Sequence, residues 1–211
     1  MRDFRRNRQP HFQARNTSYS VTILLHDALT GPQVERVRRK LADALDAIRA
    51  DGDGDKALRI EKARTESFLY LENLLHAQAS QSHALSDAEV AGAVVDYLRK
   101  FDEELYRLHA CSVMSNHAHA LFDLSPQFDE SREDIAWPVD RLIGRLKGGS
   151  AHAANQLLGR SGTLWMRGYH DRYVRSVKHF VWVKNYILQN PVKAGLVGDW
   201  RMHAGTWCPE R

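Results

Sequence analysis

The spacing of apolar residues along the chain predicts alternating strands and helices. Residues 18–25 are rich in β-branched and apolar side chains, which is typical of a strand. After a break at Gly31-Pro32, apolar residues recur at helical spacing. The predicted helices cover residues 33–48, 57–77, 87–101 and 142–158. Strands separated by runs of helices favour an α+β domain.

Two more strands are predicted over residues 105–113 and 117–124, around a short turn. Because side chains alternate between the two faces of a strand, His117 and His119 point to the same side. The better core face is the opposite one, which carries Ala118, Ala120, Phe122 and Leu124. Both histidines are therefore expected to be available as imidazole ligands for a divalent metal.

The histidine pair is weak evidence when it stands alone. A chain with 11 His is expected to contain roughly 0.6 His-x-His pairs by chance. The alternative interpretation is two half-buried strand histidines with no ligand.

A last helix is predicted from the N-cap Ser176 to Pro191, because the residue before a proline disfavours helical angles. Tyr186 and Asn190 are four residues apart and share a face of this helix. Their phenol and amide are suited to attack a phosphodiester and to bind a metal. Tyrosine is a rare nucleophile with a pKa of about 10, so a core aromatic is the alternative.

Composition favours a single globular domain of 211 residues with 43% hydrophobic content. We expect a basic arm over residues 1–16, a domain over 17–200 with a helical insertion at about 51–103, and a tail over 201–211. No apolar run is long enough to span a membrane, and the start lacks the apolar core of a secretion signal. Two cysteines without metal-type spacing favour free thiols in the cytoplasm.

Charge is segregated along the chain. Residues 1–15 carry five Arg and one Asp, a net charge of +4, and residues 16–140 carry 13 basic and 22 acidic side chains, a net charge of −9. Residues 141–211 carry 12 basic and 3 acidic side chains, a net charge of +9. The tyrosine helix lies in this last part, which favours a phosphate-rich partner.

Three sequence blocks carry a family resemblance. Residues 113–121 (VMSNHAHAL) resemble the VMPNHVHLL segment of the single-tyrosine HUH transposases. Residues 165–175 (WMRGYHDRYVR) resemble their WQRGYYDRxIR block, and residues 186–197 (YILQNPVKAGLV) resemble their YIxxNPVRAGLV block. Order and spacing agree from about residue 105 to 197. Within that superfamily, the long segment before the histidine strand and the third block point to the REP-associated tyrosine transposases.

The resemblance implies a ferredoxin-like or RRM-like central antiparallel sheet with helices on one face. It implies that His117, His119 and Asn190 bind Mg²⁺ or Mn²⁺. It also implies that Tyr186 cleaves and rejoins single-stranded, hairpin-bearing DNA through a covalent 5′-phosphotyrosine. Relatives are homodimers or monomers, and the sequence leaves both states open.

Three positions depart from the family pattern. Ser115 replaces the usual proline before Asn-His, which loosens the turn but removes no chemistry. Ala118 is smaller than the usual residue between the histidines. Some relatives carry Gln at the third metal position, where this chain has Asn190 next to Gln189, so either amide is a candidate ligand.

Basic residues near the three blocks and in the amino-terminal arm are the candidate DNA contacts. For those on helices, ordinary solvated charge is the alternative, and Asp171 with Arg172 fits a structural pair equally well. The candidates are Arg5, Arg6, Arg8, Arg145, Lys147, Arg167, Arg172, Arg175 and Lys193.

Two other functions remain as hypotheses. One is a domesticated DNA-binding protein that recognises repeat hairpins without turnover, against which the intact His117, His119 and Tyr186 argue. The other is a zinc-dependent hydrolase in which Tyr186 is structural. Its third ligand would normally be His, Cys or a carboxylate at a fixed spacing, and none is evident near the pair.

Overall fold

The structure, a computed structural model, describes residues 17–51, 55–77, 83–128, 136–174 and 176–209. The chain divides into two compact units. One consists of residues 1–26 and 83–211, and the other of residues 27–82. Within the described ranges, no helix has the length and apolar character needed to cross a membrane.

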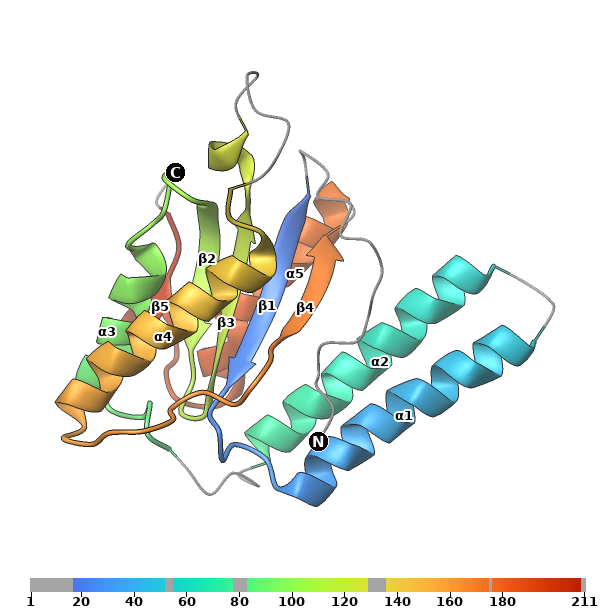
Figure 1. Ribbon diagram of the computed structural model, residues 1–211, viewed down its shortest axis with the longest axis horizontal. Helices are drawn as coiled ribbons and strands as arrows, with labels where there is room; N and C mark the ends of the chain where they lie inside the picture. Colours follow the sequence, from blue (N-terminus) through green and yellow to red (C-terminus); the bar gives the residue numbers. More distant parts are fainter. Residues whose placement is uncertain (1–16, 52–54, 78–82, 129–135, 175, 210–211) are drawn as a thin grey trace. The chain divides into compact units, whose positions relative to one another are not determined.

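The first unit is built on a five-stranded sheet in which all neighbouring strands are antiparallel. Its order is β4-β1-β3-β2-β5 (Figure 1). The strands are β1 (Ser18–Leu24), β2 (Arg107–Val113), β3 (His117–Asp123), β4 (His170–Val174) and β5 (Thr206–Trp207). The three strands predicted from sequence are confirmed, whereas β4 and β5 are too short and too polar to show an apolar pattern.

Three helices belong to this unit, and they cover both faces of the sheet (Figure 1). They are α3 (Ala88–Arg99), α4 (Val139–Leu157) and α5 (Val177–Lys193), with short 3₁₀ turns at Ser125–Gln127 and Trp200–Met202. Strands β1 to β4 with α3 and α4 follow the ferredoxin-like β-α-β-β-α-β order, which confirms the predicted fold class. The prediction of helices on one face only is wrong, because α5 covers the opposite face.

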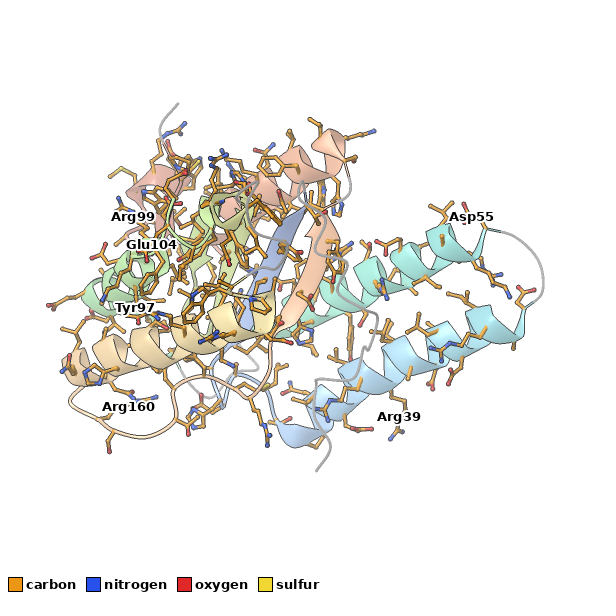
Figure 2. All side chains as sticks on the ribbon, turned by 45° about the horizontal axis from the view of Figure 1, so that its top comes forward. Arg39, Asp55, Tyr97, Arg99, Glu104 and Arg160 are labelled. Atoms are coloured by element: carbon orange, nitrogen blue, oxygen red, sulfur yellow. The ribbon has the colours of Figure 1, made fainter. Side chains whose placement is uncertain are left out.

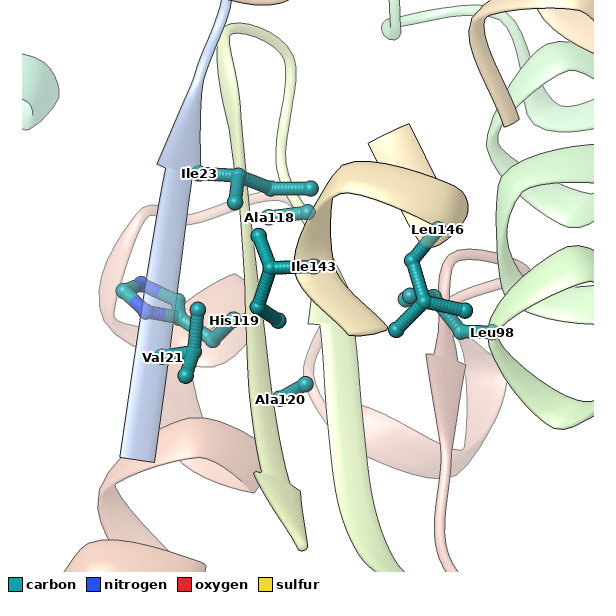
Figure 3. A pocket seen from close by; sticks show the side chains of 8 residues that line it. All are labelled: Val21, Ile23, Leu98, Ala118, His119, Ala120, Ile143 and Leu146. Atoms are coloured by element: carbon teal, nitrogen blue, oxygen red, sulfur yellow. The ribbon is translucent and has the colours of Figure 1, made fainter. Parts of the chain in front are cut away.

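The face under α3 and α4 is aliphatic. Ile143 and Leu146 of α4 and Leu98 of α3 line a small apolar pocket against the sheet (Figure 3). The sheet contributes Val21, Ile23, Ala118 and Ala120 to this lining. In Figure 3 the ring of His119 points away from these aliphatic side chains. This face therefore forms the core predicted from the sequence, and the histidines belong to the other face.

Helix α3 and helix α4 approach closely at one glycine. A Cβ built on Gly149 would lie 1.8 Å from Cζ of Tyr97, whose side chain is labelled on α3 in Figure 2. The neighbouring Gly148 has open space at the same position. The packing of Tyr97 therefore accounts for a glycine at position 149, whereas nothing in the structure requires one at position 148.

Helix α5 packs its apolar side on β2, β3 and β4. Val183, Ile187 and Leu188 form a buried cluster with sheet residues that include Ala110 and Leu121. Ser176 caps the helix, because its side chain accepts a hydrogen bond from the backbone N–H of His179 at 3.1 Å.

The predicted end of this helix is wrong: helix α5 continues through Pro191 to Lys193. Proline removes only one helical hydrogen bond, and Asn190 O still accepts from Ala194 N at 3.0 Å.

The second unit is a pair of helices, α1 (Gly31–Ala50) and α2 (Lys56–His76). Thr30 and Gln33 form a capping box at the start of α1, and Asp55 caps α2 through the N–H groups of Ala57 and Leu58. These two helices and α3, α4 and α5 confirm the helices predicted from apolar spacing.

Candidate functional site

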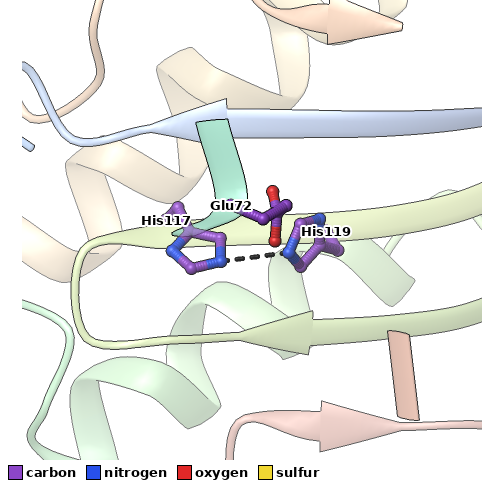
Figure 4. Close-up of side chains that lie close together, drawn as sticks. All are labelled: Glu72, His117 and His119. Carbon is purple, nitrogen blue, oxygen red and sulfur yellow. Dashed lines mark hydrogen bonds between the residues drawn. The ribbon is translucent and has the colours of Figure 1, made fainter. Parts of the chain in front are cut away.

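Two imidazoles lie side by side on the α5 face of β3. The register of the sheet pairs His119 with Thr22 and His117 with Leu24 of β1. The rings of His117 and His119 are 4.7 Å apart between centroids and nearly perpendicular, at 82°. Their Nε2 atoms are 3.0 Å apart, as the dashed line in Figure 4 marks. Glu72, also drawn there, is a buried residue of α2 in the second unit.

The opposite nitrogen of each ring is held by an oxygen. Nδ1 of His117 lies 2.6 Å from Oδ1 of Asn116, and Nδ1 of His119 lies 2.9 Å from Oγ1 of Thr22. An oxygen that accepts from Nδ1–H leaves the lone pair on Nε2, which is how metal-binding histidines are normally oriented. When both rings carry their proton on Nδ1, the two Nε2 lone pairs face one another, and a cation bound to both would replace the hydrogen bond between them.

Helix α5 covers this pair, which changes one expectation from the sequence. His117 and His119 are each only 1% exposed, whereas the sequence predicted an available face. The two-residue strand pattern identified the shared side of the strand but could not show that a helix lies over it. The site is therefore enclosed, and a low dielectric strengthens any interaction with charge inside it.

Asn190 meets an independent test for a ligand. Its side chain is 0% exposed, and neither its Oδ1 nor its Nδ2 has a hydrogen-bond partner among the described residues. A buried amide without a partner costs about 1–3 kcal/mol, so such a group normally takes a partner from outside the chain, an ordered water or an ion. The neighbouring Gln189 is exposed. Of the two amides left open by the sequence, Asn190 is the one turned into the protein.

These donors fit a divalent cation. The Nε2 atoms of His117 and His119 are close enough together to bind one ion. An amide oxygen from Asn190 would add the oxygen donor that Mg²⁺ and Mn²⁺ prefer, and imidazole is compatible with manganese.

Tyr186 lies beside the histidines, one helical turn before Asn190. Its ring centroid is 6.0 Å from that of His119, in an edge-to-face contact at 80°. The ring of Trp182 stacks on that of Tyr186, with centroids 5.6 Å apart and an angle of 21° between the ring planes. Lys193 places its Nζ 4.7 Å from the ring centroid. The tyrosine is partly buried and packs against the cluster beneath α5, so its ring position is fixed.

Tyr169 and Tyr173, the tyrosines of the second sequence block, are less suited to act as nucleophiles. Tyr169 donates a hydrogen bond to the carboxylate of Asp140. Burial and that carboxylate raise the pKa of Tyr169 well above its usual value. Tyr173 packs against Tyr19 on the neighbouring strand, with centroids 5.3 Å apart.

The predicted DNA contacts have different surroundings. Lys147 donates to the backbone carbonyls of Met166 at 2.5 Å and Gly168 at 2.6 Å, so it ties the second block to α4. The guanidinium of Arg145 lies over the rings of Phe101 and Trp137, at 4.4 and 4.9 Å.

Arg172 is a residue of β4, Arg167 precedes that strand, and Lys193 ends α5. Four of the nine candidates lie outside the described residues, namely Arg5, Arg6, Arg8 and Arg175.

Sequence reasoning missed the groups that orient the histidines. Asn116 precedes His117 directly and belongs to the first sequence block, so the sequence could have indicated that it lies beside this histidine. Thr22 comes from a strand 97 residues away from His119, and only the sheet register brings it there. A second polar pair on this face was also missed: Nε2 of His109 lies 2.7 Å from Oδ2 of Asp123.

Comparison with known proteins gives a distant structural likeness. No protein-family model matches the chain, and no curated protein matches it. The chain is similar to a solved structure of a REP-associated tyrosine transposase bound to a REP hairpin, at 16% identity and a TM-score of 0.44. The match covers 95% of this chain and 78% of that one. That protein is of the family that the three sequence blocks resemble. A likeness this distant carries no argument about activity, which rests on the geometry above.

Proposed function

We propose that this protein is a metal-dependent DNA endonuclease and strand transferase that acts on single-stranded, hairpin-bearing DNA. Tyr186 is the nucleophile, and His117, His119 and Asn190 hold Mg²⁺ or Mn²⁺. The observation that carries the proposal is the approach of Tyr186 to a buried histidine pair whose Nε2 atoms converge at 3.0 Å. Tyrosine, imidazole pair and buried amide occur together on one strand and one helix.

In the proposed reaction, the metal-binding residues and Tyr186 have separate roles. A bound cation would polarise the scissile phosphate as a Lewis acid. The phenol oxygen of Tyr186 attacks phosphorus and loses its proton to water, and the bond from phosphorus to the 3′ oxygen breaks. The 3′ oxygen takes up a proton and leaves as a hydroxyl, while the 5′ phosphate stays on the tyrosine. Attack by another 3′ hydroxyl reverses the step and joins strands without an external energy source.

The proposed contacts with DNA follow the charge of the chain. Residues 141–211 carry a net charge of +9, which suits a polyanion. Arg145, Lys147, Arg167, Arg172 and Lys193 are the described candidates for phosphate contacts. Lys193 lies closest to the chemistry, because its ammonium is positioned over the Tyr186 ring.

The test is formation of a covalent adduct. Labelled single-stranded hairpin DNA is incubated with the protein and Mn²⁺, and the mixture is separated by denaturing electrophoresis. Wild-type protein should give a protein–DNA band that disappears with a chelator. Tyr186→Phe keeps the ring and its packing but lacks the attacking oxygen, so it should bind DNA and form no adduct. Tyr173→Phe is the matched control and should retain the adduct.

The same experiment separates the alternatives. DNA binding without any adduct in the wild type would favour a hairpin-binding protein without turnover. Cleavage that continues in Tyr186→Phe and releases free ends would favour a metal-dependent hydrolase. An adduct retained in Tyr186→Phe would show that another residue is the nucleophile.

A further inference from the structure

A row of aromatic side chains runs along α5 beside the candidate site. His179, Trp182 and Tyr186 follow one another at spacings of three and four residues, so they lie on the same side of the helix. Trp182 is stacked on Tyr186 at 5.6 Å and 21°, and the ring of His179 lies 6.2 Å from Trp182 at 40°. The row extends from the buried histidine pair outward to the surface.

Trp182 is the exposed member of this row. It is 43% exposed, although it is one of the largest apolar side chains in the chain. The apolar side of α5 that packs on the sheet consists of other residues, among them Val183 and Ile187. Trp182 therefore contributes little to the core. A large ring held parallel to its neighbour and open to solvent is an available surface for another flat ring.

The charge of α5 indicates what kind of ring would stack on Trp182. Helix α5 carries Lys178, Lys184 and Lys193 and no acidic residue. An aromatic side chain on a helix whose charged residues are all basic suits the bases of a polyanionic strand, because the cations attract the phosphates while the ring accepts a base. An acidic protein segment would interact only with the lysines, and an apolar segment only with the ring. An unpaired nucleic-acid strand interacts with both, through its phosphates and its bases.

We infer that Trp182 is a stacking platform for an unpaired nucleobase of the DNA strand whose phosphate reaches Tyr186. This inference rests on the proposed function for its substrate. A base that packs on the exposed part of Trp182 joins the row of His179, Trp182 and Tyr186, and so fixes the strand relative to the nucleophile. A paired base is already stacked on both sides, so the platform selects single-stranded DNA over duplex. Trp182 is thus a positioning residue and takes no part in bond making.

Binding is measured in the presence of a chelator, so that it does not depend on cleavage. The probes are oligodeoxythymidine and a strand of equal length in which every nucleotide is abasic, which has the same phosphate charge but nothing to stack. Wild-type protein should prefer the strand with bases by about 5- to 100-fold, the range expected for loss of one base–aromatic stack. Trp182→Ala should lose most of that preference without changing affinity for the abasic strand.

Two variants keep the test specific. Trp182→Phe retains a ring and should recover a large part of the preference. Val181→Ala shortens an adjacent side chain that is 51% exposed and should leave both affinities unchanged. Because Trp182 is on the surface, the thermal midpoint of Trp182→Ala should stay close to that of wild type, which shows that the variant is folded.

The outcomes are distinguishable from failure of the proposed activity. Base preference that depends on Trp182 supports the platform even if no covalent adduct forms. Normal adduct formation with equal base preference in wild type and Trp182→Ala overturns the platform and leaves the nuclease standing. Absence of any binding to single-stranded DNA overturns both. If Trp182→Ala instead changes the sedimentation of the protein and not its DNA affinity, this face joins two copies of the chain and the inference is wrong.

Discussion

Nε2 of His117 lies 3.0 Å from Nε2 of His119, and the far nitrogen of each ring is fixed by an oxygen from a neighbouring residue. For His119 that oxygen is Oγ1 of Thr22, which is 2% exposed. These oxygens orient both imidazole rings. A site organised in this way should be sensitive to the groups behind the ligands as well as to the ligands themselves.

Thr22→Val tests this orientation, because valine has nearly the same shape and lacks the hydroxyl. We expect Mn²⁺ affinity to fall by about 10- to 100-fold, the usual effect of losing a group that orients a ligand. Isothermal titration with Mn²⁺ measures it. Thr22→Ser keeps the oxygen and should restore most of the affinity, whereas unchanged affinity in Thr22→Val would show that Thr22 does not orient His119.

Asn190→Leu should separate stability from metal binding. In a chelator the variant should be more stable than wild type by about 1–3 kcal/mol, because it replaces a buried amide that has no hydrogen-bond partner. It should also lose the increase in thermal midpoint that Mn²⁺ gives the wild type. Urea denaturation and thermal melts with and without Mn²⁺ measure these effects. Gln189→Leu, at the exposed neighbour, should change neither; a destabilised Asn190→Leu would argue against a ligand role.

Gly148 and Gly149 should respond in opposite ways to the same substitution. Gly148→Ala meets open space and should stabilise the protein by about 1 kcal/mol through helix propensity. Gly149→Ala places its Cβ 1.8 Å from the Tyr97 ring, so the ring must leave its position. That displacement should cost about 1–3 kcal/mol. The free energy of unfolding in urea is the measurement. In a Tyr97→Ala background the penalty at Gly149 should vanish, and a persistent penalty would mean that this contact is not its cause.

Asp123 should contribute a pH-dependent part of the stability. Burial alone would raise its pKa, but hydrogen bonds from His109 and Ser125 outweigh burial and hold the pKa of Asp123 below its usual value. A carboxyl group with a lowered pKa in the folded state stabilises the fold above its unfolded pKa of about 3.9. That contribution disappears as the pH falls through the lower, folded value.

Asp123→Asn should therefore be less stable than wild type at neutral pH by about 1–3 kcal/mol, and the two proteins should converge in strong acid. Urea denaturation across the acidic range measures the difference. Asp96, whose side chain is 79% exposed, is the matched control, and Asp96→Asn should be neutral at every pH. A difference between Asp123→Asn and wild type that stays constant with pH would contradict the assignment.

Much of the fold could be predicted because it depends on local patterns. The strands around His117 and the helices α1 to α4 follow from apolar periodicity, and the cap at Ser176 follows from its side chain. Pro191 is the exception. The sequence predicts that this proline ends the helix, but packing of Ile187 and Leu188 on the sheet outweighs the missing hydrogen bond and the crowding of the proline ring. Such packing is a property of the assembled unit and leaves no local signal.

For the candidate site, the sequence by itself determined the chemical types and their local spacing. The alternation of a strand fixes His117 and His119 on one side, and the helical repeat aligns Tyr186 with Asn190. Only the tertiary structure decided that these two pairs meet. The sheet register brings Thr22 to His119, and the apolar side of α5 carries Tyr186 over the same face. The physical reason is distance along the chain. Backbone geometry fixes how residues a few positions apart are placed, whereas burial of apolar area brings together segments that are far apart in the sequence.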